Sequence, residues 1–137
     1  MVRGARYAYV ALAWAFVAGI VLQVFFIGLG LFVDADDLEL HVAFGWILHL
    51  WPILILGAAA LARAGRTRIL QAAALAVTVF IVPILVTLRA DSPLAAAFHP
   101  VGALLAFWLA IVVARAATDL VRAADEVESP AVAPIGG

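Results

Sequence analysis

The chain has 137 residues, of which 68% are apolar and 12% are charged, and its formal net charge is −1. A soluble domain is typically about 45–50% apolar and about 25% charged, so a compact water-soluble fold of this length could not bury so much apolar surface. The composition therefore excludes a cytosolic enzyme, a nucleic-acid-binding domain and a disordered tail, and it predicts an integral membrane protein.

Four long apolar runs follow one another within a predicted membrane domain of residues 1–122. They cover about residues 7–33, 40–61, 69–88 and 94–114, and each is near or above the roughly 20 residues that a helix needs to cross a bilayer core. Because lipid offers the backbone no hydrogen bonds, all four are predicted to be helices. The first is about twice as long as a signal-peptide core of roughly 7–15 residues, so we expect it to be retained. Connections of about five to seven residues favour an all-α, up-down-up-down four-helix bundle.

The basic residues are distributed asymmetrically between the two sides of this bundle. All of them are arginine, and seven lie before the first span, between the second and third spans, or after the fourth: Arg3, Arg6, Arg63, Arg66, Arg68, Arg115 and Arg122. Arg89 alone lies on the opposite side. By the positive-inside rule, both termini are predicted to be cytoplasmic, in a multi-pass protein of the bacterial inner membrane.

Residues at the predicted helix ends agree with these spans. Asp36 or Asp37 is placed to cap the second helix, and Ser92 and Pro93 suit the N-cap and first position of the fourth. Residues 123–137 are first acidic and then rich in proline and glycine, which predicts a disordered cytoplasmic tail.

Three histidines lie within the predicted spans: His41 and His49 on the second and His99 on the fourth. Ionisable groups at membrane depth are costly and are functional candidates by default. Gly45 follows His41 by four residues and Gly102 follows His99 by three, so each glycine shares a helix face with its histidine. A flat macrocycle held by an imidazole needs a small residue beside it. The pattern is therefore compatible with one b-type haem between the second and fourth helices, with His41 and His99 as iron ligands.

The depths of the histidines in the membrane indicate that His41 and His99 are the pair of ligands. If the helices begin after Asp37 and Ser92, His41 lies about 6 Å and His99 about 10 Å from the external helix ends, whereas His49 lies about 18 Å deep. His49 is also turned about 80° from His41 around the helix axis. We therefore expect His49 to be a wall of the site, a hydrogen-bond partner or an alternative ligand.

Two other polar features of the spans bear on the site. Gln23 lies in the middle of the first span and is expected to face inward. Pro100 directly follows His99 and frees the carbonyl of Ala96, so a local kink is predicted to help aim the His99 imidazole.

Two alternatives draw on the same residues. The histidines and glycines could serve only helix packing and hydrogen bonding, which would make the protein a non-enzymatic membrane subunit or helper without a cofactor. A metal ion could instead bind at the external mouth, where carboxylate and imidazole ligands cluster: Asp34, Asp36, Asp37, Glu39 and His41. No acidic residue lies deep in a span, which argues against an ion-coupled transporter.

The stretches from His41-Val-Ala-Phe-Gly45 through Pro52 and Phe98-His99-Pro100 resemble an uncharacterised family of small bacterial four-helix membrane proteins. More distantly, a histidine on the second helix and another on the fourth is similar to one half of haem A synthase and to haem bundles of the cytochrome b561 kind. This resemblance implies axial roles for His41 and His99. The chain lacks a second four-helix half and any cysteine, and it has three histidines, so a single haem or none is implied rather than synthase chemistry.

The sequence thus predicts a small membrane protein that binds one haem b and passes electrons. Its expected partners are the lipid bilayer and another membrane protein or redox partner, with no nucleic acid. The alternative prediction is the cofactor-free membrane subunit.

Overall fold

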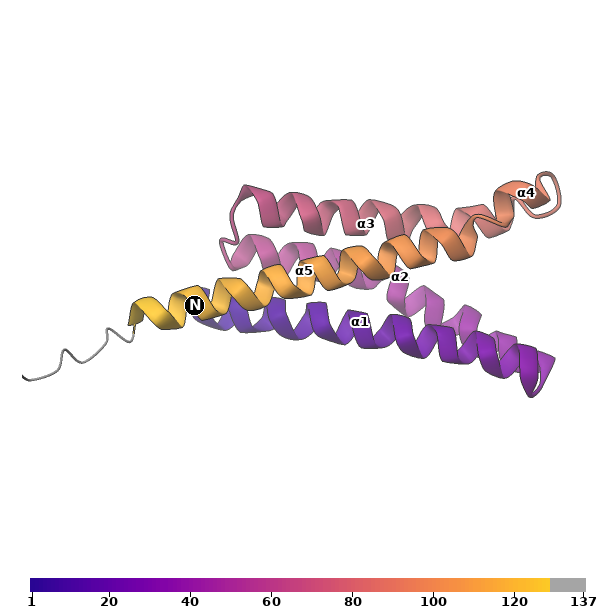
Figure 1. The fold of residues 1–137 in the computed structure, drawn as a ribbon, viewed down its shortest axis with the longest axis horizontal. Helices are drawn as coiled ribbons and strands as arrows, with labels where there is room; N and C mark the ends of the chain where they lie inside the picture. Colours follow the sequence, from indigo (N-terminus) through magenta and orange to yellow (C-terminus); the bar gives the residue numbers. More distant parts are fainter. Residues whose placement is uncertain (129–137) are drawn as a thin grey trace, which may run out of the picture.

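The computed structural model describes residues 1–128, and within them every regular element is a helix (Figure 1). The segments are α1 (Val2–Phe32), the 3-10 turn η1 (Ala35–Asp37), α2 (Leu38–Leu61), α3 (Arg66–Thr87), α4 (Pro93–Ala96) and α5 (His99–Glu128). Four stretches of this described part are long and apolar enough to cross a membrane: α1, η1 with α2, α3, and α4 with α5. The prediction of an all-α fold with four apolar spans is confirmed.

The long helices form two hairpins, α1–α2 and α3–α5, that lie side by side. α1 packs against α2 and α5, and α3 packs against α2 and α5, so α2 and α5 lie diagonally across the bundle. Figure 1 shows the start of α1, the α2–α3 connection and the end of α5 at one end of the molecule. We call this the terminal end and the opposite end, where each hairpin turns, the distal end.

Buried side chains gather in the half of the bundle nearest the terminal end. Small residues let helix backbones approach closely in a membrane, where there is little hydrophobic driving force between helices. The alanines of this core come from all four long helices, and larger side chains fill the gaps between them. Its fully buried large residues are Tyr9, Phe16, Pro52, Ile55, Leu75 and Val113.

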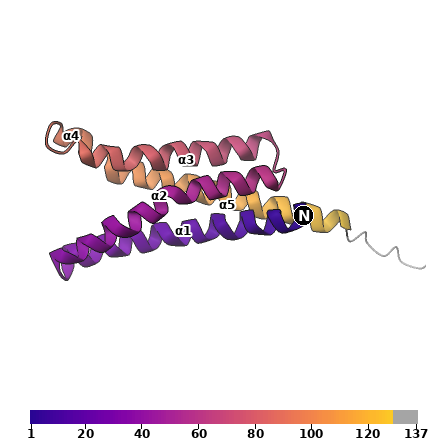
Figure 2. The same ribbon diagram turned by 180° about the vertical axis from the view of Figure 1, so that it is seen from behind.

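The distal half of the bundle is packed differently. Among residues 17–32, 38–47, 77–87 and 99–105, Gly30 is the single buried residue, and it packs against Leu38 of its own hairpin. Figures 1 and 2 show the two hairpins diverging toward this end. The hairpins are therefore joined by a packed core near the terminal end and separate distally.

The predicted fourth span is interrupted near its start. α4 ends at Ala96, and a turn precedes α5, which begins at His99. Pro100 has no N–H to offer the carbonyl of Ala96, and its ring clashes with that carbonyl, so a continuous helix is unfavourable here. Ser92 and Pro93 occupy the predicted N-cap and first positions, but the Ser92 side chain makes no capping hydrogen bond.

The far end of α5 extends beyond the predicted membrane domain. The helix runs to Glu128, six residues past the predicted boundary of the membrane domain at residue 122. Asp125 explains the extension, because it accepts a hydrogen bond from the Tyr7 hydroxyl (3.3 Å) and pairs with Arg3 (3.5 Å). These contacts hold the last turns of α5 against the start of α1. The rest of the predicted tail, residues 129–137, lies outside the described residues.

Candidate functional site

His41 joins α2 to α1 through a reciprocal pair of hydrogen bonds. Its ring Nδ1 lies 3.1 Å from the main-chain oxygen of Gln23, and the Gln23 side-chain amide donates to the main-chain oxygen of His41 at 2.7 Å. The other atom of that side-chain amide, Gln23 Oε1, is buried and has no partner within residues 1–128. Gln23 faces inward, as predicted, and its role as the partner of His41 was not foreseen.

His99 makes the equivalent contact in the second hairpin. Its ring Nδ1 lies 3.0 Å from the main-chain oxygen of Val82 on α3. His99 is the first residue of α5, so the break in front of Pro100 sets the position from which this ring reaches α3. Both histidines are half-buried and lie in the distal half of the bundle.

The two hairpins thus repeat one arrangement. In each, a histidine on the second helix donates to a carbonyl on the first, and the sequence separations are similar, 18 and 17 residues. In each, the glycine that follows the histidine packs against the side chain of the residue that supplies the carbonyl. A Cβ on Gly45 would lie 3.0 Å from Gln23 Nε2, and a Cβ on Gly102 would lie 2.8 Å from Val82 Cγ2.

These hydrogen bonds fix the tautomer that each ring adopts in its neutral form. A carbonyl oxygen can only accept, so Nδ1 must carry the proton in His41 and in His99. A neutral imidazole has one N–H, and Nε2 of each ring therefore keeps its lone pair. A ring nitrogen with a free lone pair, held by a hydrogen bond at the other nitrogen, is the usual state of a histidine that ligates a metal.

The helix face that carries each glycine and its histidine is turned toward the first helix of the same hairpin. The glycines share a face with their histidines, but the space beside them is filled by the Gln23 amide and a Val82 methyl group. No hydrogen bond or ring contact joins His41 to His99 among the described residues. The structure places these two histidines on diagonal helices, each anchored within its own hairpin.

His49 lies between α2 and α3 and makes ring contacts only, within residues 1–128. Its ring meets Phe80 of α3 edge-on at a centroid separation of 4.3 Å, and Trp46 of α2 lies 5.9 Å away. His49 therefore packs α2 against α3 through its ring.

The acidic connection between α1 and α2 is organised by hydrogen bonds of its own turn. The carboxylate of Asp34 accepts a hydrogen bond from the backbone N–H of Asp36 at 3.0 Å, which stabilises the turn. Asp37 takes the N-cap position of α2 without a side-chain hydrogen bond. No group of three or more histidine or acidic side chains within residues 1–128 comes together to hold a metal ion. The metal alternative built on these acids, Glu39 and His41 therefore has no support.

Comparison with known protein families found a match within the helical region. A protein-family model described as a family of unknown function (DUF6220) matches residues 23–88, just under half of the chain. This similarity agrees with the resemblance to an uncharacterised family. The matched region holds His41, Gly45 and His49 but ends before His99 and Gly102. No curated protein and no solved structure matches the chain, so the likeness to haem A synthase and cytochrome b561 bundles rests on the placement of the histidines alone.

Proposed function

We propose that this chain is a small multi-pass membrane protein that binds one b-type haem between its two hairpins and passes electrons. His41 and His99 are the axial ligands. The observation that carries the proposal is the hydrogen bond from Nδ1 of each ring to a helix carbonyl, at 3.1 and 3.0 Å. These bonds orient both imidazoles and leave both Nε2 lone pairs for iron.

The position of the two rings supports the same function. Both lie in the distal half, where the hairpins diverge and bury little against each other. Cofactors in helical bundles are commonly held between side chains of different helices, and His41 on α2 and His99 on α5 come from different hairpins. Hydrogen bonding at Nδ1 raises the basicity of Nε2. When bound, the haem would supply one-electron transfer, and the protein would supply ligation and an apolar surrounding.

The arginine distribution gives the proposed orientation. With both termini in the cytoplasm, the distal end faces the outside of a bacterial inner membrane, and the haem lies in the outer half of the bilayer. The electron donor or acceptor would be another membrane protein or a carrier at that face.

A second function, a cofactor-free membrane subunit, is favoured by the way the same residues pack. The spaces beside Gly45 and Gly102 are occupied by side chains of the neighbouring helices, and the ring of His49 packs on Phe80. Every residue of the proposed site therefore also has a packing role that needs no haem.

A difference spectrum separates the two functions. The protein is expressed with added haem precursor, purified in detergent and recorded as dithionite-reduced minus oxidised. Haem binding predicts the sharp α band of a low-spin b-type cytochrome in the wild type, its loss in His41→Ala and in His99→Ala, and its retention in the matched control His49→Ala. A featureless wild-type spectrum from a protein that is helical by circular dichroism would contradict the haem and leave the subunit function.

A further inference from the structure

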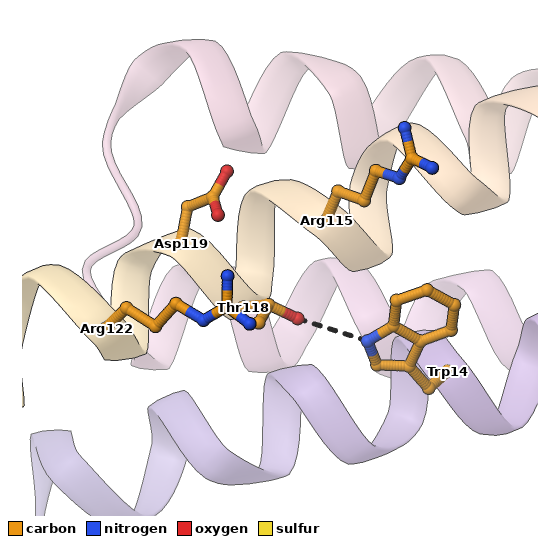
Figure 3. A pocket seen from close by; sticks show the side chains of 5 residues that line it. All are labelled: Trp14, Arg115, Thr118, Asp119 and Arg122. Carbon is orange, nitrogen blue, oxygen red and sulfur yellow. Dashed lines mark hydrogen bonds between the residues drawn. The ribbon is translucent and has the colours of Figure 1, made fainter.

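A pocket lies between α1 and α5 near the terminal end, remote from the histidines. It measures about 310 Å³ and is lined by Trp14 of α1 and by Arg115, Thr118, Asp119 and Arg122 of α5 (Figure 3). Nothing in the proposed haem function uses these residues.

Hydrogen bonds fix one wall of this pocket. The Trp14 indole donates to the Thr118 hydroxyl at 3.1 Å, and that hydroxyl donates to the main-chain oxygen of Ala114 at 2.9 Å. Figure 3 shows the indole pointing from α1 toward Thr118. The indole and the hydroxyl therefore hold α1 against α5. The charged side chains of the pocket are the groups available to bind a ligand.

The charges around the pocket are mainly positive. Arg115 and Arg122 are seven residues apart, so they lie on the same face of α5, almost two helical turns from each other. Neither forms an ion pair or hydrogen bond within residues 1–128. Asp119 lies between them, and on its other side a pocket of about 240 Å³ includes Arg68 and Gln71 of α3. The two pockets that share Asp119 are thus lined by three arginines and one carboxylate.

This cluster lies where the apolar part of the span ends. Arg115 is the first charged residue after the apolar run of residues 94–114, and Trp14 is partly exposed beside it. Tryptophan is enriched at the level of lipid headgroups, and basic pockets between membrane helices bind anionic headgroups. We infer that the pocket between α1 and α5 binds the headgroup of an anionic phospholipid, with its phosphate between Arg115 and Arg122.

A phosphate group fits the unused donors of this site. Each guanidinium presents parallel N–H donors that match phosphate oxygens, and such charge-assisted hydrogen bonds are stronger than neutral ones. The acyl chains of the same lipid would continue along the apolar surfaces of α1 and α5, which a soluble phosphate could not do. The inference holds for whichever leaflet faces the terminal end.

Native mass spectrometry tests this site. The detergent-purified protein is incubated with an equimolar mixture of phosphatidylglycerol and phosphatidylcholine that have the same acyl chains. The double variant Arg115→Gln/Arg122→Gln is compared with Arg63→Gln/Arg66→Gln, which removes two charges from the α2–α3 connection at the same end. We expect the wild type and the control to retain phosphatidylglycerol preferentially. The pocket variant should lose about fivefold in that preference for each arginine.

Two results would overturn the inference. Equal losses in the two double variants would show that the preference follows overall charge and not the pocket. Protection against thermal unfolding by millimolar inorganic phosphate, equal to that by phosphatidylglycerol, would show a site for soluble phosphate. Both arginines are exposed, so their replacement should leave the helical circular dichroism unchanged.

Discussion

Replacing Gly102 with alanine tests how closely α5 packs on α3 beside His99. The new Cβ would lie 2.8 Å from Val82 Cγ2, closer than side chains tolerate. Valine has one strongly preferred rotamer in a helix, so the two helices must move apart. Overpacking of this kind costs about 1–3 kcal/mol, whereas a helical alanine in place of glycine gains about 1 kcal/mol.

Gly57→Ala is the matched control, because a Cβ at Gly57 meets nothing within 4 Å. Gly57→Ala gains the same helix propensity as Gly102→Ala, but its new Cβ clashes with no neighbouring side chain. The free energy of unfolding should therefore be about 1–3 kcal/mol lower for Gly102→Ala than for Gly57→Ala. The assay is unfolding by dodecyl sulfate in mixed micelles, followed by circular dichroism. Equal stability of the two variants would refute the close contact, and with it the position of α5 that lets His99 reach α3.

The remaining predictions use the same unfolding assay. Gln23→Leu removes the 2.7 Å hydrogen bond to the His41 carbonyl. The free energy of unfolding should fall by about 0.6 kcal/mol, and at most by about 2 kcal/mol, which is the range for hydrogen bonds between membrane helices. A stabilised variant would contradict this contact. Trp51→Phe removes the 3.0 Å bond from the indole to the Leu12 carbonyl and should cost a similar amount, so an unchanged midpoint would argue against it. His49→Ala should lose about 0.5–1.5 kcal/mol of ring contact with α3 while leaving any haem spectrum unchanged, and loss of that spectrum would make His49 a ligand.

The helices themselves could be predicted from the sequence because lipid leaves the backbone no alternative. The predicted spans and the observed helices differ by a few residues at most of their ends. The exception is the fourth span, where Pro100 separates α4 from α5 and contacts through Asp125 carry α5 to Glu128. The proline was visible in the sequence, but the partner of Asp125 depends on how α1 and α5 meet.

The direction in which each histidine points could not be predicted. A helix that is apolar all round has no polar stripe to show which face meets a neighbour, and α1, α2 and α3 are of this kind. The orientation of Gln23 could be predicted, because a polar side chain in the middle of a span is expected to face inward. The role of Val82 could not be predicted, because it contributes a main-chain carbonyl, which every residue carries. The repeated arrangement of histidine, carbonyl and glycine is therefore visible only in the folded chain.

Titration of the purified, haem-free protein with hemin tests directly whether His41 and His99 hold one haem. The Soret band is followed as hemin is added to the wild type, to His41→Ala, to His99→Ala and to the control His49→Ala. We expect saturation at one haem per chain for the wild type and for the control, and no saturable binding for the other two variants. Saturation of all four proteins at the same stoichiometry, or of none, would contradict a haem held between the two hairpins by His41 and His99.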